Sequence, residues 1–289
     1  MAAVSTVVGV VMIVVALNDV FHTLLRPAST GRLTTLVFRS VWGLSRGRRT
    51  LLVVGGPLTV LLTIMVWIVL LAFGWALVYL PHVPDGFSYS GVDPEQYHPF
   101  LESLTFSLVA LTTLGLGDVV PAEPLIRLLS PLEALTGFVL LSGAVSWFMQ
   151  LYPALARRRA LAIELTSMHA AGMTTLPPAV TSGVAASVVS SVARAIAELT
   201  ADLVQNTEIF YFAEKDERLS AARAVGYAME LRDAAACAED ADVRLAGAVL
   251  AETLDELGRV LTDQYPHVTG DSTDEVLRAV AGSHGYTFG

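Results

Sequence analysis

Charge is scarce in this sequence. Asp, Glu, Lys and Arg make up 16% of the 289 residues, whereas a soluble globular chain carries about 25%. Residues 1–152 hold only seven arginines and eight acidic residues. The remaining 137 residues hold eleven basic and nineteen acidic side chains, and so carry eight of the nine net negative charges. This pattern predicts a membrane domain followed by an acidic soluble domain.

Cysteine and catalytic motifs are also nearly absent. Cys237 stands alone, which excludes an intrachain disulfide and a cysteine-based metal cluster and fits a reducing cytoplasm. The acidic tail offers no basic patch for nucleic acid. The six histidines show no metal-ligand spacing, and the chain has no nucleophile motif. We therefore expect neither an enzyme nor a cofactor.

The sequence contains three long apolar runs, at residues 3–25, 51–80 and 131–155. A helix of about 20 apolar residues spans the roughly 30 Å of hydrocarbon in a bilayer. The first run lacks the basic start and the cleavage site of a signal peptide. We therefore predict that residues 1–25 form an additional N-terminal transmembrane helix.

The arginines predict the orientation in the membrane. Six lie between the first two runs without any acidic residue, and three follow the third run, whereas the loop at 81–99 has no basic residue. The positive-inside rule then places residues 26–50 and the tail in the cytoplasm, and the N-terminus and residues 81–130 outside. Apolar residues alternate with Arg39 and its neighbours at helical spacing, which predicts an interfacial helix within 26–50. The alternative is a solvated basic loop.

The most informative stretch lies between the second and third runs. Residues 99–112 are apolar but too few to cross a membrane, and Pro99 and Glu102 suit the start of a helix. Non-helical backbone that follows at membrane depth must be buried in protein or line an aqueous path. Two alternating glycines, Gly115 and Gly117, let successive carbonyl groups point to one side. Such a column, with the Thr113 hydroxyl at its inner end, can replace the hydration shell of a monovalent cation.

The sequence Thr113-Leu-Gly-Leu-Gly-Asp118 resembles the Thr-x-Gly-x-Gly-Asp selectivity filter of potassium channels, and Pro121, Arg127 and Gly137 follow at the spacings of simple two-helix bacterial pores. The resemblance implies a pore domain at 51–152, with an outer helix at 51–80, a pore helix at 99–112, a filter at 113–118 and an inner helix at 127–152. It also implies a hinge at Gly137 and Asp118 at the outer mouth. K⁺ would bind to the carbonyl groups of Thr113, Leu114, Gly115, Leu116 and Gly117 and to the Thr113 hydroxyl.

The filter departs from the family at Leu116, where an aromatic residue is usual, and Thr105 and Phe106 replace a common tryptophan pair. A non-selective monovalent cation channel, which also passes Na⁺, is therefore the alternative. Gly-Leu-Gly does resemble the second filter of some two-pore-domain potassium channels. Because one chain supplies one filter and a ring of carbonyl groups needs four, we expect a homotetramer.

Two further features of the pore domain concern the gate and the charged residues. Phe138, Leu141, Val145 and Met149 share one face of the inner helix and could close the pore by dewetting, or could simply pack against the outer helix. Glu133 could pair with Arg127 or meet interfacial water. Asp19 and His22, one helical turn apart, could sense protons or anchor arginines of the neighbouring loop.

Residues 153–289 are expected to form an α-helical cytoplasmic domain that biases the gate, with helices at 156–170, 178–205, 216–236, 239–264 and 272–282. No nucleotide-binding motif or EF-hand loop occurs there. The aromatic segment 209–212 could be core or could contact a ligand or the gate, and Glu239, Asp240 and Asp242 could start a helix or attract divalent cations.

The fold class is thus an all-α membrane protein with three transmembrane helices, a re-entrant pore helix and filter, and a helical tail whose ligand is unknown. We predict a K⁺ channel of a bacterial plasma membrane, surrounded by lipid; a non-conducting membrane sensor or adaptor is a further alternative.

Overall fold

The structure, a computed structural model, describes residues 2–24, 30–45, 49–91, 93 and 96–287, without the side chains of residues 49 and 50. Arg26, Arg46 and Arg48 of the predicted basic segment and Glu95 of the outer loop lie outside the described residues. The other elements that the sequence predicts can be compared with the structure directly.

The predicted all-helical fold is confirmed. The helices are α1 (Ala2–Leu24), α2 (Arg32–Ser45), α3 (Arg49–Tyr79), α4 (Pro99–Leu111), α5 (Pro124–Ala170), α6 (Ser182–Gln205), α7 (Ala221–Ala236), α8 (Ala241–Gln264) and α9 (Thr273–Ser283). Short 3-10 turns are η1 (Leu80–His82), η2 (Met173–Thr175), η3 (Thr207–Tyr211) and η4 (Glu217–Leu219). The strands β1 (Phe87–Tyr89) and β2 (Val119–Pro121) form an antiparallel pair in which Phe87 faces Pro121.

Four helices, rather than the three predicted, are long and apolar enough to cross a membrane. The fourth is α6, whose most apolar window has a mean hydropathy of 1.4, the lowest of the four. It packs along α8, and its Asp202 forms an ion pair of 2.6 Å with Arg157 of α5. These contacts fit a helix of a soluble bundle as well as a membrane span.

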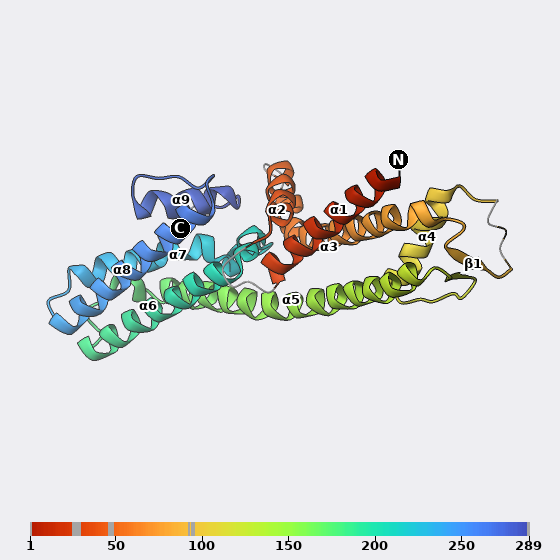
Figure 1. Cartoon of the computed structure of the whole chain (residues 1–289). Coiled ribbons are helices and arrows are strands. Elements are labelled where there is room, and N and C mark those ends of the chain that lie inside the picture. Colours follow the sequence, from red (N-terminus) through yellow and green to blue (C-terminus); the bar gives the residue numbers. More distant parts are fainter. Residues whose placement is uncertain (1, 25–29, 46–48, 92, 94–95, 288–289) are drawn as a thin grey trace. The chain divides into compact units, whose positions relative to one another are not determined.

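The contacts divide the chain into two compact units. The first unit comprises residues 1–37 and 60–148, and the second comprises residues 38–59 and 149–289. The sequence predicted boundaries after residues 25, 50 and 152, and α5 runs without interruption across the last of these, from Pro124 to Ala170. The end of α2 and the start of α3 therefore pack with the tail (Figure 1).

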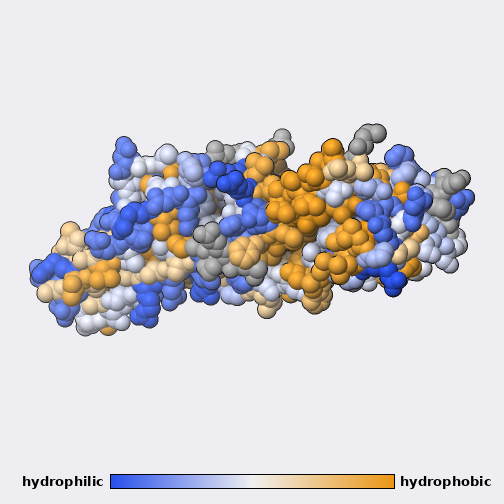
Figure 2. Space-filling view, in the orientation of Figure 1, coloured by the Kyte–Doolittle hydropathy of each residue, from blue (hydrophilic) through white to orange (hydrophobic). Residues whose placement is uncertain are grey.

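In the first unit, small residues let α1 and α3 approach closely. A Cβ atom added at Gly9 would lie 2.4 Å from the carbonyl oxygen of Gly74, and one added at Gly74 would lie 2.8 Å from Ile13. Such contacts are typical of helices that pack inside membranes. Away from α3, seven valines of α1 are exposed, and Figure 2 shows apolar side chains gathered over this helix; they are Val4, Val7, Val8, Val10, Val11, Val14 and Val15.

Asp19 ties α1, α2 and α3 together. Its buried carboxylate accepts hydrogen bonds from the backbone N–H groups of Leu33 (2.8 Å) and Thr34 (3.1 Å), from the Thr34 hydroxyl (2.8 Å) and from the Trp67 indole (2.9 Å). A carboxylate satisfies the free N–H groups at a helix N-terminus and is favoured there by the helix dipole. Asp19 therefore anchors the following segment through the start of α2.

The second unit is a helical bundle in which α8 packs against α6, α7 and α9. Asp240 starts α8 by accepting hydrogen bonds from the N–H groups of Asp242 (2.9 Å) and Val243 (3.3 Å). The acidic residues at 239–242 thus include a helix cap, as one of the two interpretations predicted.

Three of the four residues of the aromatic segment 209–212 are buried in this unit, and Phe212 is half-buried. Phe210 and Tyr211 are 3% and 7% exposed, and both rings contact Trp42 of α2, with centroid distances of 5.8 and 5.5 Å. A Cβ atom added at Gly56 of α3 would lie 2.7 Å from the Phe212 ring. The segment is therefore core, and it joins α2 and the start of α3 to the tail.

Candidate functional site: the pore helix and filter

The pore helix α4 is too short to cross a bilayer. Its 13 residues span about 20 Å at 1.5 Å per residue. Pro99 occupies its first turn as predicted, and the side chain of the N-cap residue His98 accepts a hydrogen bond of 3.2 Å from the N–H of Phe100. The helix therefore begins at a defined point and brings its C-terminal end to the start of the filter.

The inner end of the filter is fastened to the last turn of α4. The N–H of Thr113 donates to the carbonyl oxygen of Ala110, and the N–H of Leu114 donates to that of Val109, both at 3.0 Å. These bonds use the N–H groups of the filter and leave the carbonyl groups beyond them available. The last turn of α4 thus sets the direction of the filter backbone that follows it.

The filter backbone alternates between two conformations. Thr113, Gly115 and Gly117 have φ angles of +58°, +60° and +82°, whereas neither Leu114 nor Leu116 has a positive φ. Alternation of left-handed residues with ordinary ones turns successive carbonyl groups toward the same side, and glycine adopts this conformation without strain. Thr113 does so at a steric cost of about 1 kcal/mol. The sequence predicted the role of the two glycines, but not the left-handed Thr113.

The outer end of the filter is held by β1. The carbonyl oxygen of Asp118 accepts a hydrogen bond of 2.8 Å from the N–H of Ser90, and Tyr89 pairs with Val119 in the strand register. The Asp118 carboxylate accepts from the N–H of Val119 at 3.0 Å. Residues 113–117 are therefore held at both ends, by the last turn of α4 and by β1.

Gly137 of α5 lies directly against the end of the pore helix. A Cβ atom added there would lie 1.9 Å from the carbonyl oxygen of Leu111, which is closer than any side chain can approach. The helix α5 is continuous through this position. The structure thus gives Gly137 a packing role that the sequence did not reveal, and its role as a hinge stays a prediction.

Glu133 lies one turn before Gly137 and also faces the pore helix. It is fully buried, and its Oε1 atom lies 2.6 Å from the hydroxyl oxygen of Ser107. The same hydroxyl lies 3.0 Å from the carbonyl oxygen of Ala72 on α3. Both interpretations of Glu133 are therefore wrong, because its partner is Ser107 rather than Arg127 and it does not meet water. The four-residue spacing of Glu133 and Gly137 is the signal that could have placed both on the face toward α4.

The predicted gate residues form an exposed stripe on α5. Phe138, Leu141, Val145 and Met149 are 61%, 65%, 56% and 72% exposed. Within a single chain they are thus not packed against the outer helix, although α5 does meet α3 elsewhere, through Trp147 and Trp67. An apolar stripe of this kind needs lipid or a further protein surface to cover it.

The backbone of residues 113–117 is the candidate site for a cation. Residues 112–117 are exposed along the single chain, and in the described part of the chain no cluster of three His, Cys, Asp or Glu side chains could hold a metal ion. A dehydrated monovalent cation can be held by a ring of carbonyl oxygens. One chain supplies one row of such oxygens.

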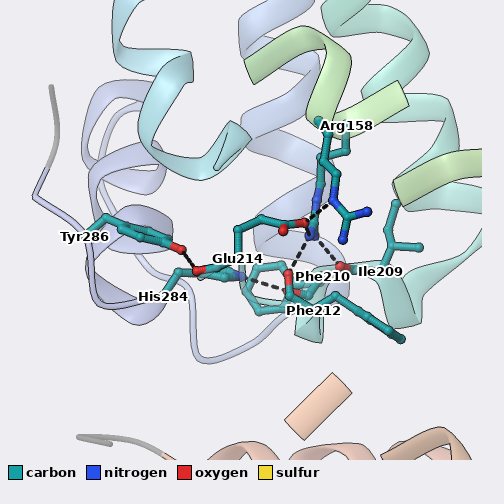
Figure 3. A network of polar contacts seen from close by, with 8 residues as sticks. Arg158, Ile209, Phe210, Phe212, Glu214, His284 and Tyr286 are labelled. Carbon is teal, nitrogen blue, oxygen red and sulfur yellow. Dashed lines mark hydrogen bonds and ion pairs between the residues drawn. The ribbon is translucent and has the colours of Figure 1, made fainter. Parts of the chain in front are cut away.

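A second polar cluster follows the predicted inner helix, within the second unit (Figure 3). The buried guanidinium of Arg158 donates to the carbonyl oxygens of Ile209 and Phe212, both at 2.6 Å, and to the Glu214 carboxylate at 3.2 Å. Arg159 also donates to Glu214, at 2.8 Å. In the sequence these arginines served as a topology signal after the third run. In the structure, Arg158 joins the second half of α5 to the aromatic segment, and Arg159 joins it to Glu214.

Comparison with known proteins supports the pore. Residues 59–152, about a third of the chain, match the protein family described as "Ion channel". The chain is 39% identical over 95 residues to "Two pore potassium channel c" of Oryza sativa, which covers 29% of this chain and 20% of that protein. It is 24% identical over 167 residues to "Uncharacterized membrane protein YdjJ" of Bacillus subtilis, which covers 56% of this chain and 48% of that protein.

The chain thus spans half or less of the length of these relatives, and no solved structure matches it significantly. The pore helix, the alternating filter and these similarities together support an ion channel in a multi-pass membrane protein, with a pore module similar to that of a potassium channel.

Proposed function

We propose that four copies of the chain form a potassium-selective channel that moves K⁺ passively across the plasma membrane. The N-terminus then lies outside and the helical tail, in the cytoplasm, biases the gate. The observation that carries this proposal is the alternation of left-handed residues at 113, 115 and 117 in exposed backbone that directly follows a half-length helix. Four such rows around an axis provide the ring of oxygens that replaces water around K⁺.

A non-selective cation channel with the same architecture is the second candidate, and Leu116 favours it. Leu116 has no hydroxyl that could bond to the pore helix. It lines a cavity of about 310 Å³ between the filter and α4, together with Glu102, Thr105 and Phe106. A filter backed by open space widens more easily than one backed by packed side chains.

The reversal potential in planar bilayers, with K⁺ on one side and Na⁺ on the other, distinguishes the two candidates. A potential close to the Nernst value for K⁺ is the expected result, and a value near zero would overturn selectivity. In the second case, Leu116→Tyr should restore part of the preference for K⁺. Leu128→Tyr, at an exposed position of α5, is the matched control and should not.

Flux into liposomes under a K⁺ gradient tests conduction itself. If the full chain gives no flux, truncation after Arg159 separates a closed gate from a pore that does not conduct. Flux that appears on truncation would support the gating role of the tail. Absence of flux from both forms would favour a membrane sensor or adaptor.

A further inference from the structure

A cavity of about 340 Å³ opens in the second unit, outside the pore. It lies between α2 and two segments of the tail, and its lining residues are Arg39, Trp42, Gly43, Tyr211, Pro266 and His267. A volume of this size accommodates a phosphate group with part of an attached ester. By contrast, the space beside Arg158 and Glu214 measures about 50 Å³, which suffices for little more than a water molecule.

Arg39 supplies positive charge to this cavity. Its side chain is exposed, and its guanidinium lies close enough to the Tyr211 phenol to bond to it. Burial raises the pKa of Tyr211, and Arg39 opposes that rise. The phenol thus remains protonated at neutral pH and keeps a proton to donate. Guanidinium and phenol together offer an anion several hydrogen-bond donors from two different elements.

Trp42 lines the cavity with its ring rather than with its indole N–H. The side chain is 5% exposed, and the indole nitrogen is closed off from solvent. An anion in the cavity would therefore lie against the ring and would take its hydrogen bonds from Arg39 and Tyr211. The ring itself is held by contacts with Phe210, Tyr211 and His284.

Little negative charge opposes an anion at this place. Glu208, the acidic residue that acts on Tyr211, is buried, and burial raises its pKa to about 7. Near neutral pH its carboxyl is therefore partly protonated. Leu36 and Leu44 of α2 are 62% and 82% exposed, so that the helix which carries Arg39 also presents apolar side chains suited to a membrane surface.

We propose that the cavity formed by Arg39, Trp42 and Tyr211 binds a phosphate group, carried by an anionic lipid headgroup or free in solution. The guanidinium pairs with the phosphate oxygens, and the Tyr211 phenol donates to one of them. The exposed leucines of α2 favour the lipid as the source. Because α2, the start of α3 and the aromatic segment meet in this unit, an occupied site would stabilise their contact. Binding does not depend on whether the pore conducts.

Isothermal titration calorimetry on the full chain in detergent tests the site. The probes are dioctanoyl phosphatidic acid, dioctanoyl phosphatidylcholine and inorganic phosphate. We expect phosphatidic acid to bind more tightly than phosphatidylcholine. Arg39→Gln should weaken binding of phosphatidic acid about tenfold or more, since it removes a charge-assisted contact. Tyr211→Phe, which keeps a ring and removes the hydroxyl, should weaken it about fivefold.

Arg32→Gln is the matched control, because Arg32 is an exposed arginine of the same helix that does not line the cavity. The affinity of the Arg32→Gln variant for phosphatidic acid should equal that of the unchanged chain. Binding of inorganic phosphate with the same dependence on Arg39 would support the site and identify the free anion as its ligand. Equal weakening by Arg32→Gln and Arg39→Gln, equal binding of the two lipids, or no binding of any probe would overturn the proposal. Arg39→Gln keeps this test valid even if Tyr211→Phe does not fold, because Arg39 is exposed.

Discussion

At the scale of single residues, Gly137 marks the closest approach of α5 to the pore helix. Gly137→Ala places a Cβ atom 1.9 Å from the Leu111 oxygen, so that α4 or α5 must shift and the filter with it. We expect flux into liposomes to fall at least tenfold. Gly143→Ala in the same helix meets the end of the flexible Leu24 side chain and should be far milder. Equal flux from both variants would contradict the packing role of Gly137.

Glu133 and Ser107 form the buried contact between α5 and α4. Glu133→Leu leaves the Ser107 hydroxyl with the Ala72 carbonyl group alone, and we expect a loss of about 1–3 kcal/mol in stability. Glu133→Gln retains an acceptor and should cost less. Thermal melting of the purified protein measures both. The double variant Glu133→Leu/Ser107→Ala should cost less than the sum of the single changes, and strict additivity would show that the contact contributes nothing.

His284 makes the stability of the second unit depend on pH. Burial lowers its pKa to about 4, and the Nε2 atom lies 2.8 Å from the Phe210 carbonyl oxygen. The unfolded chain, with a pKa near 6.5, binds the proton more readily. The contribution of His284 to the free energy of unfolding is therefore fully present above about pH 6.5. It falls, by about 3 kcal/mol in total, as the pH drops toward 4.

The melting temperature between pH 7 and pH 4 tests this dependence. Glu208 acts in the opposite direction: burial raises its pKa to about 7, so its contribution is lost as the pH rises from about 4.5 through 7. The difference between the unchanged chain and His284→Gln isolates the histidine. An identical pH slope in the two proteins would contradict the prediction.

At the scale of elements, α2 depends on a residue of another helix. Asp19→Ala removes the acceptor for two N–H groups at the start of α2 and for the Trp67 indole, and loss of such a cap costs about 1 kcal/mol or more. We expect faster amide hydrogen exchange across Arg32–Ser45. Asn18→Ala, at an adjacent exposed position, is the control. Unchanged exchange in Asp19→Ala would show that packing alone holds the helix.

The elements show what a sequence can predict. The long apolar runs and the Pro and Gly breaks are local signals, and α6 and α8 lie within a few residues of the helices that they predict. The helices predicted at 127–152 and 156–170 are instead one continuous helix, α5. The Glu133–Ser107 contact and the burial of residues 209–212 depend on partners 26 or more positions away. The sequence of a buried acid or aromatic segment does not indicate which distant residue it contacts, so these features could not be predicted. Gly115 and Gly117 are local signals that also bear on the proposed function, because their positive φ angles could be expected from the residue type alone.

At the scale of the whole molecule, the exposed stripe of α5 would face its copies across the pore of the proposed tetramer. Four copies of Leu141 and Val145 would make a constriction that repels water. Leu141→Ser should therefore hydrate the closed pore and raise the flux into liposomes severalfold. Val139→Ser, at a position that is 49% exposed and on another face of the helix, should leave the flux unchanged. Equal flux from Leu141→Ser and the unchanged chain would exclude dewetting as the gate.

The exposure of residues 112–117 in the single chain has a thermodynamic consequence. A row of carbonyl groups along one chain is a fragment of a site, and if the proposed ring forms, only the assembly has affinity for the ion. A ligand that binds one state of an equilibrium pulls the equilibrium toward that state. The permeating cation would then also hold the subunits together, and its depletion would favour dissociation as surely as dilution does.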